Sequence, residues 1–511
     1  MEYQSILYAP SSGPPEEGEG RVSRDTVIDL NLGPVLESIV KGRDRDYLLS
    51  IYLHPLHTIR EVRYRQEVFR DLQRQDLVRC AREFHEKIER FHRYLHLAAR
   101  SPSQFYARGW FFSAVAEYCH AVTGIFRSLR EAPLESGALR ELLIQLTHYV
   151  ESEHFAAMKA KVEELAEPLE RVEYCLDIRG RTVRISPFRG ECDYRTRVGA
   201  AFGDMSREAS RDYVSIHARQ SPTSWLDERI AESVAQFYPE TFGELRQFCD
   251  RHRDFLEPAV VEFDRDLQFY ISYIDEMSAI ADEQLKFCIP EVVVHGDEFM
   301  ARDMFDLALA GARGTGDEKV VTNSFHLGGG ERILMITGAN QGGKTTFARA
   351  VGQIHFFAAI GCPVPARSAR LQLCDAIFTH FEREEDLRRL RGKMEDDLLR
   401  IRDILEHMTS KSLLIMNEIF TSATPADELS LSRGILRQII EKRALGVWVT
   451  FLEELSQVDE TVVSMVPEVD PRDPSIRTYR VRRRRPDGMA YARSLAQKYG
   501  LTREQIEERI R

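Results

Sequence analysis

Gly338-Ala339-Asn340-Gln341-Gly342-Gly343-Lys344-Thr345 is a glycine-rich octapeptide between an apolar run at 333–336 and helix-favouring sequence. A strand, a glycine-rich turn and a helix in this order are typical of a phosphate-binding P-loop. The glycines let backbone amides surround the phosphates, Lys344 adds a point charge, and the Thr345 hydroxyl can ligate Mg²⁺. The helix N-terminus contributes partial positive charge. The octapeptide predicts a nucleotide-binding protein, with an ordinary glycine-rich turn as the alternative.

A second apolar run, at 413–416, ends in Asn417-Glu418, where P-loop ATPases carry their second motif. That motif normally ends in Asp-Glu, because the Asp helps to hold Mg²⁺ and the Glu orients or deprotonates the attacking water. We expect Glu418 to be the catalytic residue, and Asn417 and Thr345 to be the metal ligands. An amide oxygen is neutral, so Mg²⁺ binds more weakly here or solvent waters complete its shell.

The composition describes a multidomain globular protein. At 511 residues and 43% hydrophobic content, the chain should divide into two to four domains. Its net charge of -11 excludes a uniformly basic nucleic-acid platform, so any DNA contact must use local patches. The eight cysteines show no metal-like spacing and are expected to be buried reduced thiols. The start lacks a signal-peptide pattern and no apolar run reaches about 18 residues, so we expect a cytoplasmic protein without a membrane span.

The residue pattern divides the chain into three parts. Residues 1–25 contain a Pro-, Gly-, Ser- and Glu-rich stretch and are expected to be a flexible tail. Residues 26–290 are expected to be mainly α-helical, because apolar residues recur at helical spacing, as between Leu77 and Leu95. Beyond Pro290 short apolar strands alternate with helices, which predicts an α/β domain at 291–511.

The helical pattern is interrupted between residues 174 and 221. Residues 175–185 alternate around a glycine, which predicts a β-hairpin or a small β insertion. The arginines of this insertion are one candidate for a DNA-facing tip. A solvated hairpin face explains them equally well.

The ordered motifs of the second half resemble the MutS family of DNA mismatch repair ATPases. Residues 337–346 are similar to the family's TGPNMGGKST, and Val321-Thr322-Asn323 to its Val-Pro-Asn. The segments at 361–366 and 375–379 are similar to Gly-x-x-Val-Pro-Ala and Asp-x-Ile-Phe-Thr, and the segment from Asn417 to Asp427 aligns with the family's second motif. The helical half resembles the family's core and lever domain more weakly.

The resemblance implies a mainly α-helical core/lever domain followed by an α/β P-loop ATPase domain of the ABC type. It also implies a homodimer with two composite sites for ATP and Mg²⁺, supported by a closing helix-turn-helix at 490–501. Asn323 would contact the base, and Thr424 would belong to the composite-site segment. The implied nucleotide-binding residues are Gly338, Ala339, Asn340, Gln341, Gly342, Gly343, Lys344, Thr345, Thr346, Asn323 and Thr424.

Three departures from the family pattern limit this comparison. Core-like sequence begins within the first ~50 residues, so we expect no mismatch-reading N-terminal domain ahead of it. Phe84-His85-Glu86 mimics that domain's Phe-x-Glu, but Phe84 lies on an apolar helical stripe and is expected in the core. Asn417 replaces the usual Asp. Phe451 stands where the family has a His, and a phenyl ring cannot hydrogen-bond a γ-phosphate.

These observations favour a MutS-like ATPase acting in DNA repair or recombination. Its nucleotide state would open or close a DNA-embracing homodimer that recognises DNA structure, not a mismatch. A catalytically weak nucleotide-binding switch or scaffold is the alternative, motivated by Asn417 and Phe451. A small-molecule P-loop kinase is disfavoured because the long helical half would have no purpose. The arginines at 477–485 could meet phosphate, although a solvated or interface role is favoured.

Overall fold

The computed structural model describes residues 3–10, 12–13, 20–180, 182–190, 225–312, 319–338, 340–382, 393–470, 476–486 and 501–510. It divides into two compact units. The helical unit comprises Met1–Tyr3, Gln75–Pro133 and Arg140–Asp264, and the sheet unit comprises Gln4–Arg74, Leu134–Leu139 and Arg265–Arg511. The domain limits inferred from residue patterns, at 25 and 290, stay predictions.

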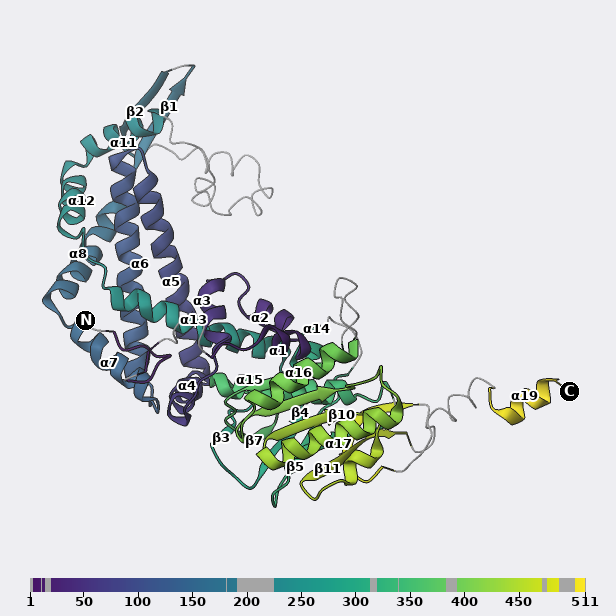
Figure 1. Cartoon of the computed structure of the whole chain (residues 1–511). Helices are drawn as coiled ribbons and strands as arrows, with labels where there is room; N and C mark the ends of the chain where they lie inside the picture. The colour runs from purple at the N-terminus through teal and green to yellow at the C-terminus, as the bar shows by residue number, and fades with distance from the viewer. Residues whose placement is uncertain are drawn as a thin grey trace. The chain divides into compact units, whose positions relative to one another are not determined.

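Two long helices run side by side in the helical unit, α5 (Gln75–Arg100) and α6 (Gln104–Glu131) (Figure 1). The apolar stripe of α5 is buried from Leu77 to Phe91, as its spacing predicts, whereas Leu95 is partly exposed. Phe84 is 2% exposed and packs on Phe263 with ring centroids 5.3 Å apart, so its predicted core role is confirmed. This unit also contains α8 (Glu153–Glu170), α11 (Trp225–Phe237) and α12 (Pro239–Arg251), whereas α7 (Gly137–Val150) and α13 (Pro258–Ile280) are each divided between the two units.

The predicted hairpin is present as two antiparallel strands, β1 (Tyr174–Arg179) and β2 (Thr182–Pro187). Figure 1 shows them beyond one end of the α5 and α6 pair. Ile178 is 67% exposed, and Arg179 pairs with Asp177 at 3.0 Å. Residues 181 and 191–221 of the predicted insertion lie outside the described residues. A DNA-contacting role for this hairpin stays a prediction.

The sheet unit is built on a six-stranded sheet of order β12-β11-β6-β10-β9-β8. Five strands of this sheet, β6, β8, β9, β10 and β11, are parallel to one another. The sixth strand, β12, pairs antiparallel with β11. Strands β6, β9 and β10 are wholly buried, as expected for parallel strands covered on both faces. The strands are β6 (Ile333–Ile336), β8 (Ile377–Phe381), β9 (Leu413–Asn417), β10 (Leu445–Val449), β11 (Val462–Val469) and β12 (Arg477–Arg483).

A second, four-stranded mixed sheet has the order β3-β7-β4-β5. Only its β3–β7 pair is parallel. Its strands are β3 (Glu291–Val293), β4 (Phe299–Met304), β5 (Asn323–Leu327) and β7 (Ser368–Gln372). The accompanying helices are α14 (Leu307–Ala312), α15 (Lys344–Ile360), α16 (Lys393–His407), α17 (Pro425–Lys442), the 3-10 helix η1 (Glu453–Gln457) and α19 (Arg503–Ile510). The alternation of strands and helices predicted beyond Pro290 is confirmed.

Four N-terminal helices belong to the sheet unit: α1 (Arg24–Asp29), α2 (Leu32–Ile39), α3 (Arg45–Tyr52) and α4 (Ile59–Leu72). The buried amide of Gln353 on α15 donates to Leu30 O and Asp306 Oδ1, both at 2.9 Å. It also accepts from Leu307 N at 2.7 Å. Because an unsatisfied buried amide is costly, these bonds tie the N-terminal helices to α15 specifically.

The C-terminal end of α15 is fixed by a buried arginine of α4. Arg65 is 1% exposed, and its guanidinium donates to Leu7 O at 3.0 Å and to Ile360 O at 2.9 Å. The carbonyls at a helix C-terminus carry partial negative charge, so they are suitable partners for this cation. Gly361 then ends α15 with φ 87°, the left-handed conformation that favours glycine.

The predicted state of the cysteines is confirmed in part. The seven described cysteines form no disulfide with one another; Cys119, Cys249, Cys362 and Cys374 are buried, whereas the other three are partly exposed. Cys192 lies outside the described residues. No helix among the described residues is long and apolar enough to cross a membrane.

Candidate nucleotide-binding site

The glycine-rich octapeptide lies between β6 and α15, in the predicted strand–loop–helix order. Left-handed backbone at Gly338 (φ 126°), Gln341 (φ 60°) and Gly343 (φ 87°) turns the chain. A Cβ on Gly338 would also lie 3.1 Å from Pro467 Cδ, a tight contact that favours glycine, whereas a Cβ on Gly343 would be in ordinary contact with Tyr479 O at 3.4 Å. Ala339 lies outside the described residues.

The Lys344 side chain is buried within this loop. Its Nζ donates to Gly338 O at 2.7 Å and to Asn340 Oδ1 at 3.4 Å. Glu418 Oε1 lies 3.6 Å from the same nitrogen. Burial lowers the pKa of Lys344, and the neighbouring Glu418 carboxylate partly offsets this by raising it. A phosphate that binds Lys344 must therefore compete with partners that the ammonium already has.

The ring of Phe451 lies over the same ammonium, with Lys344 Nζ 4.0 Å from its centroid. Phe451 follows β10, and 46% of its surface is exposed. A cation at this distance from an aromatic face is attracted by the ring quadrupole. The substitution of His by Phe thus removes a hydrogen-bonding group but adds a cation–π partner for Lys344.

We expect Phe451→Leu to bind ADP and ATP more tightly than the natural chain. The substitution removes a cation–π contact from Lys344, whose ammonium must turn to the phosphates when a nucleotide binds. Such a contact is worth about 0.5–2 kcal/mol, which corresponds to about 2- to 30-fold in nucleotide affinity. Isothermal titration calorimetry on the whole chain measures the dissociation constant.

Phe451→Tyr is the matched control, because it keeps an aromatic face over Lys344 and should keep the natural affinity. Equal dissociation constants for the Leu, Tyr and natural chains would show that the ring does not compete with nucleotide.

The two predicted metal ligands meet across the ends of two strands. Thr345 is in the first turn of α15, and Asn417 is the last residue of β9, with β10 between β6 and β9. Thr345 Oγ1 donates to Asn417 Oδ1 at 3.0 Å. Two uncharged oxygens that converge in this way suit a hard cation such as Mg²⁺, provided that phosphates and water supply the remaining ligands. No cluster of three or more His, Cys, Asp or Glu suited to a metal occurs among the described residues.

Glu418 directly follows β9 in a strained turn. Its φ is 53° and that of Phe420 is 62°, both in the left-handed region that is unfavourable for such residues. The Glu418 amide donates to Val449 O at 2.9 Å, which fixes the turn against β10. The carboxylate is close to Lys344, as described above. Its role as the residue that orients water stays a prediction.

The hydrogen-bond partners of Asn323 and Thr424 lie outside the octapeptide. Asn323, at the start of β5, donates to Tyr479 O at 3.1 Å and accepts from Val481 N at 2.7 Å, so it joins the second sheet to β12. Thr424 caps α17 by accepting from Asp427 N at 3.3 Å and donating to Asp427 Oδ2 at 2.7 Å. Their predicted nucleotide contacts remain untested.

Tyr479 is a neighbour of the site that the sequence does not reveal. Its backbone lies against Gly343 and against the Asn323 side chain, and its φ is 56°. A lone Tyr inside an arginine-rich strand carries no local signal for this position. Only the pairing of β12 with β11 brings it to the octapeptide.

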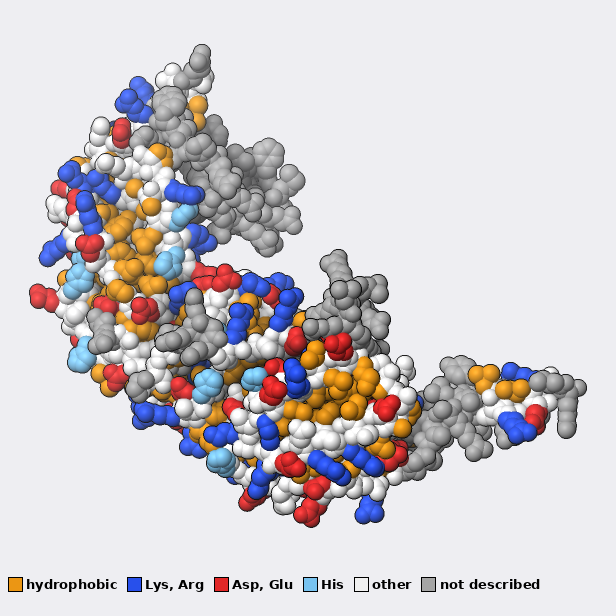
Figure 2. All heavy atoms as spheres, in the orientation of Figure 1, with side chains coloured by type: hydrophobic (Ala, Val, Ile, Leu, Met, Phe, Trp, Pro, Cys, Tyr) orange, Lys and Arg blue, Asp and Glu red, His pale blue; other side chains and the backbone are white. Residues whose placement is uncertain are grey.

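Two arginines of the arginine-rich strand lie beside carboxylates, and a third bonds to a main-chain carbonyl. Arg483 forms a bidentate ion pair with Glu331, which is consistent with the lowered pKa of that carboxyl. Arg482 lies 3.6 Å from Glu468, and Arg484 donates to Pro467 O at 3.3 Å. On the face in Figure 2, acidic and basic side chains are interspersed over the described residues. These contacts favour the interface or solvated role over a phosphate-binding one.

Comparisons with known proteins identify relatives of this half of the chain. Residues 334–494 match the family model of MutS domain V. The DNA mismatch repair protein MutS of Brevibacillus brevis is 30% identical over 200 residues, or 38% of this chain and 23% of that protein. The MutS of Trichormus variabilis is 34% identical over 156 residues, or 29% of this chain and 18% of that protein. The matched region thus spans less than a quarter of either relative.

Proposed function

The chain belongs to the MutS family, and we propose that it is an ATP-binding protein that acts on DNA in repair or recombination as a homodimer. The convergence of Lys344, Thr345, Asn417 and Glu418 at the carboxyl ends of β6 and β9 carries this proposal. The curated relatives are DNA mismatch repair proteins, but the chain spans only a small part of them. The proposed ligand is DNA structure, without mismatch recognition.

The proposed sheet arrangement is that of an ABC-type P-loop ATPase, supported by the position of β10 between β6 and β9. Residues 338–346 would hold the phosphates, and Asn323 would contact the base. Thr345 and Asn417 would hold Mg²⁺, which neutralises phosphate charge when bound. Glu418 would orient the attacking water, after its carboxylate leaves Lys344. Thr424 would complete the site of the second subunit.

The alternative function is a nucleotide-binding switch or scaffold with little turnover. Two observations favour it: Asn417 places an uncharged oxygen beside Thr345, and Phe451 covers Lys344 where the family has a His. In this version ATP promotes dimerisation without being hydrolysed. Both versions share the nucleotide site and differ only in phosphate release.

The DNA part of the proposal is tested with the purified whole chain. We expect binding to branched, nicked or duplex DNA at low salt, and an affinity that differs between ATP-bound and ATP-free protein. Fluorescence anisotropy with each labelled DNA measures both. No binding to any of the three, with or without ATP, would overturn the DNA-binding function.

Asn417→Asp should raise both Mg²⁺ affinity and phosphate release. A carboxylate at this position adds a negative charge to the metal ligands, and an effect of about 1.4 kcal/mol would be tenfold in the Mg²⁺ dissociation constant. Steady-state phosphate release at a series of Mg²⁺ concentrations measures both quantities. Robust release by the natural chain would exclude the scaffold version.

Asn417→Ala is the control for that variant, because it removes the oxygen and leaves Thr345 without its partner. It should need more Mg²⁺ than the natural chain. A Mg²⁺ requirement that is the same for Asp, Asn and Ala would show that residue 417 is not a metal ligand.

A further inference from the structure

The α1–α3 cleft, of about 570 Å³, lies between three N-terminal helices of the sheet unit. Pockets of this size hold small molecules. Five aliphatic side chains line it among the described residues, namely Val22, Val27, Leu36, Leu49 and Leu53. The other described lining residues are Arg21, Arg24, Gly33, Glu37 and Arg45. Because none of the described octapeptide residues lines this cleft, it is separate from the nucleotide site.

The walls of this cleft are fixed before any ligand binds. Thr26 Oγ1 of α1 donates to Ile377 O of β8 at 2.9 Å, which ties α1 to the six-stranded sheet. Val22 N donates to Leu53 O at 2.9 Å, so the segment before α1 is bound to the end of α3. Of the aliphatic lining residues on α3 and at its end, Leu49 is partly exposed and Leu53 is buried. The aliphatic surface is thus preformed, and a ligand need not order it.

The charged lining residues differ in whether they have partners. Arg45 Nε donates to Glu37 Oε2 at 3.1 Å, and this hydrogen bond lowers the pKa of the Glu37 carboxyl. Arg21 and Arg24 are exposed and form no ion pair within the described residues. Guanidinium groups bind carboxylate and phosphate oxygens in a bidentate manner. The cleft therefore combines an aliphatic surface with two cationic groups that are available to an anion.

We propose that the α1–α3 cleft binds a single-chain aliphatic carboxylate. Arg21 and Arg24 hold the carboxylate head group through charge-assisted hydrogen bonds. The five aliphatic lining residues remove the hydrocarbon chain of the ligand from water. This site goes beyond the proposed function, because neither a nucleotide nor DNA requires an aliphatic surface.

The lining separates this ligand from other anions. The described lining residues include no aromatic side chain on which a base could stack, so a nucleotide or nucleic acid would gain little there. The chain's net charge of -11 also repels a polyanion more strongly than a molecule with one charge. An extended peptide needs hydrogen-bond partners for its main chain, whereas helical walls use their own main-chain groups internally. A hydrocarbon chain needs no such partners.

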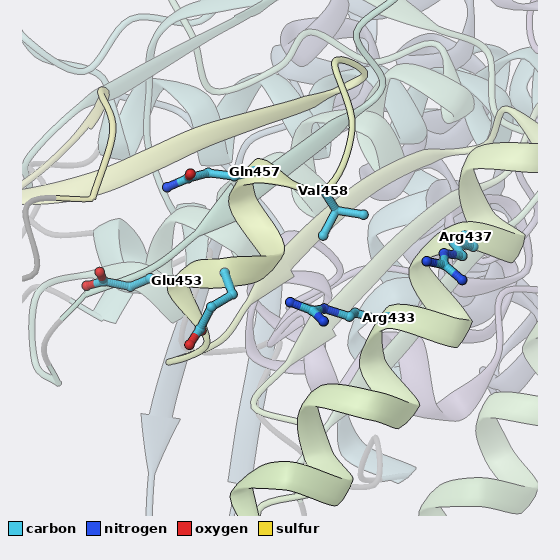
Figure 3. Close-up of a pocket in the computed structure, with 6 residues that line it drawn as sticks. Arg433, Arg437, Glu453, Gln457 and Val458 are labelled. Atoms are coloured by element: carbon cyan, nitrogen blue, oxygen red, sulfur yellow. The ribbon is translucent and has the colours of Figure 1, made fainter.

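A second cleft, of about 620 Å³ beside α17 and η1, has a different lining (Figure 3). Figure 3 shows Arg433 and Arg437 extending from α17. These two arginines are also exposed and form no ion pair within the described residues. The other described lining residues are Glu453, Glu454, Gln457 and Val458, so a single aliphatic side chain is present among them. This cleft cannot bury a hydrocarbon chain and therefore provides a matched control for the arginines of the α1–α3 cleft.

Isothermal titration calorimetry of the whole chain with decanoate and dodecanoate, each in monomeric form, tests this site. We expect one molecule to bind per chain. Dodecanoate should bind up to about tenfold more tightly than decanoate, because two further methylenes are buried. Arg21→Gln with Arg24→Gln should weaken dodecanoate binding by about tenfold or more, since the head group loses both charged partners. Leu49→Gln should also weaken it, because a polar side chain then lies against the hydrocarbon chain.

Arg433→Gln with Arg437→Gln is the matched control, and it should bind dodecanoate like the natural chain. Dodecyltrimethylammonium has the same hydrocarbon chain with a cationic head group, and it should bind the natural chain at least about tenfold more weakly than dodecanoate does. Thermal unfolding of each variant verifies that it keeps the natural fold. A natural chain that binds no dodecanoate would overturn the proposal. Equal affinities of the two double variants for dodecanoate, or equal affinities of the natural chain for the two head groups, would overturn it as well. None of these results bears on the proposed ATP site.

Discussion

Gly361→Ala should lower the free energy of unfolding of the sheet unit by about 2–5 kcal/mol. The left-handed backbone at this position costs a non-glycine residue about 1–2 kcal/mol. The added Cβ would also lie 2.9 Å from Arg65 Cβ and 3.2 Å from Val62 O. Neither neighbour is the free end of a side chain, so α4 must shift, and such overpacking costs about 1–3 kcal/mol.

Urea denaturation followed by circular dichroism measures this loss. Gly434→Ala is the matched control, because Gly434 lies inside α17 with open space at its Cβ position. Alanine there should stabilise the chain by about 0.5–1 kcal/mol through helix propensity. If both substitutions had the same effect, the close contact between α15 and α4 would not govern stability at Gly361.

Between pH 6.5 and pH 4, the free energy of unfolding should fall by about 3 kcal/mol less in His355→Leu than in the natural chain. Burial in α15 lowers the pKa of His355 from 6.5 to about 4. Its Nδ1 donates to Val351 O at 2.8 Å, and Nε2 has no partner among the described residues. Between these two pKa values the unfolded chain binds a proton that the folded chain does not, so the natural chain loses stability as the pH falls.

Chemical denaturation at a series of pH values measures this difference. Carboxylates contribute their own acid dependence, so the informative quantity is the gap between the two curves of stability against pH. His295→Gln replaces an exposed histidine of the same unit and should give a curve parallel to that of the natural chain. A parallel curve for His355→Leu as well would contradict a buried neutral His355.

The nucleotide site could be located from the sequence because its signals are local. The octapeptide, the apolar run before it and the one before Asn417 each lie within one continuous segment, and parallel strands bring their carboxyl ends to one edge. The burial of Phe84 followed from helical spacing for the same reason. The order of the strands does not follow from local pattern.

Other features depend on partners that are distant in sequence. The ring of Phe451 over Lys344 joins the segments that follow β10 and β6, two strands that are neighbours only in the folded sheet. Asn323 is satisfied by backbone groups of β12, and Gln353 by backbone groups near α1 and α14. A residue of almost any type can provide a main-chain donor or acceptor, so its identity does not predict such a hydrogen bond. Such contacts therefore require the structure.

The fixed ends of α15 have a mechanical consequence. Its first residue, Lys344, belongs to the octapeptide, and the carbonyl of its last residue, Ile360, is held by Arg65 of α4. At about 1.5 Å per residue, these 17 residues form a helix roughly 25 Å long. A buried helix in a close-packed interior is stiff along its axis. A displacement of the N-terminal end of α15, at the octapeptide, is thus transmitted along the helix to α4.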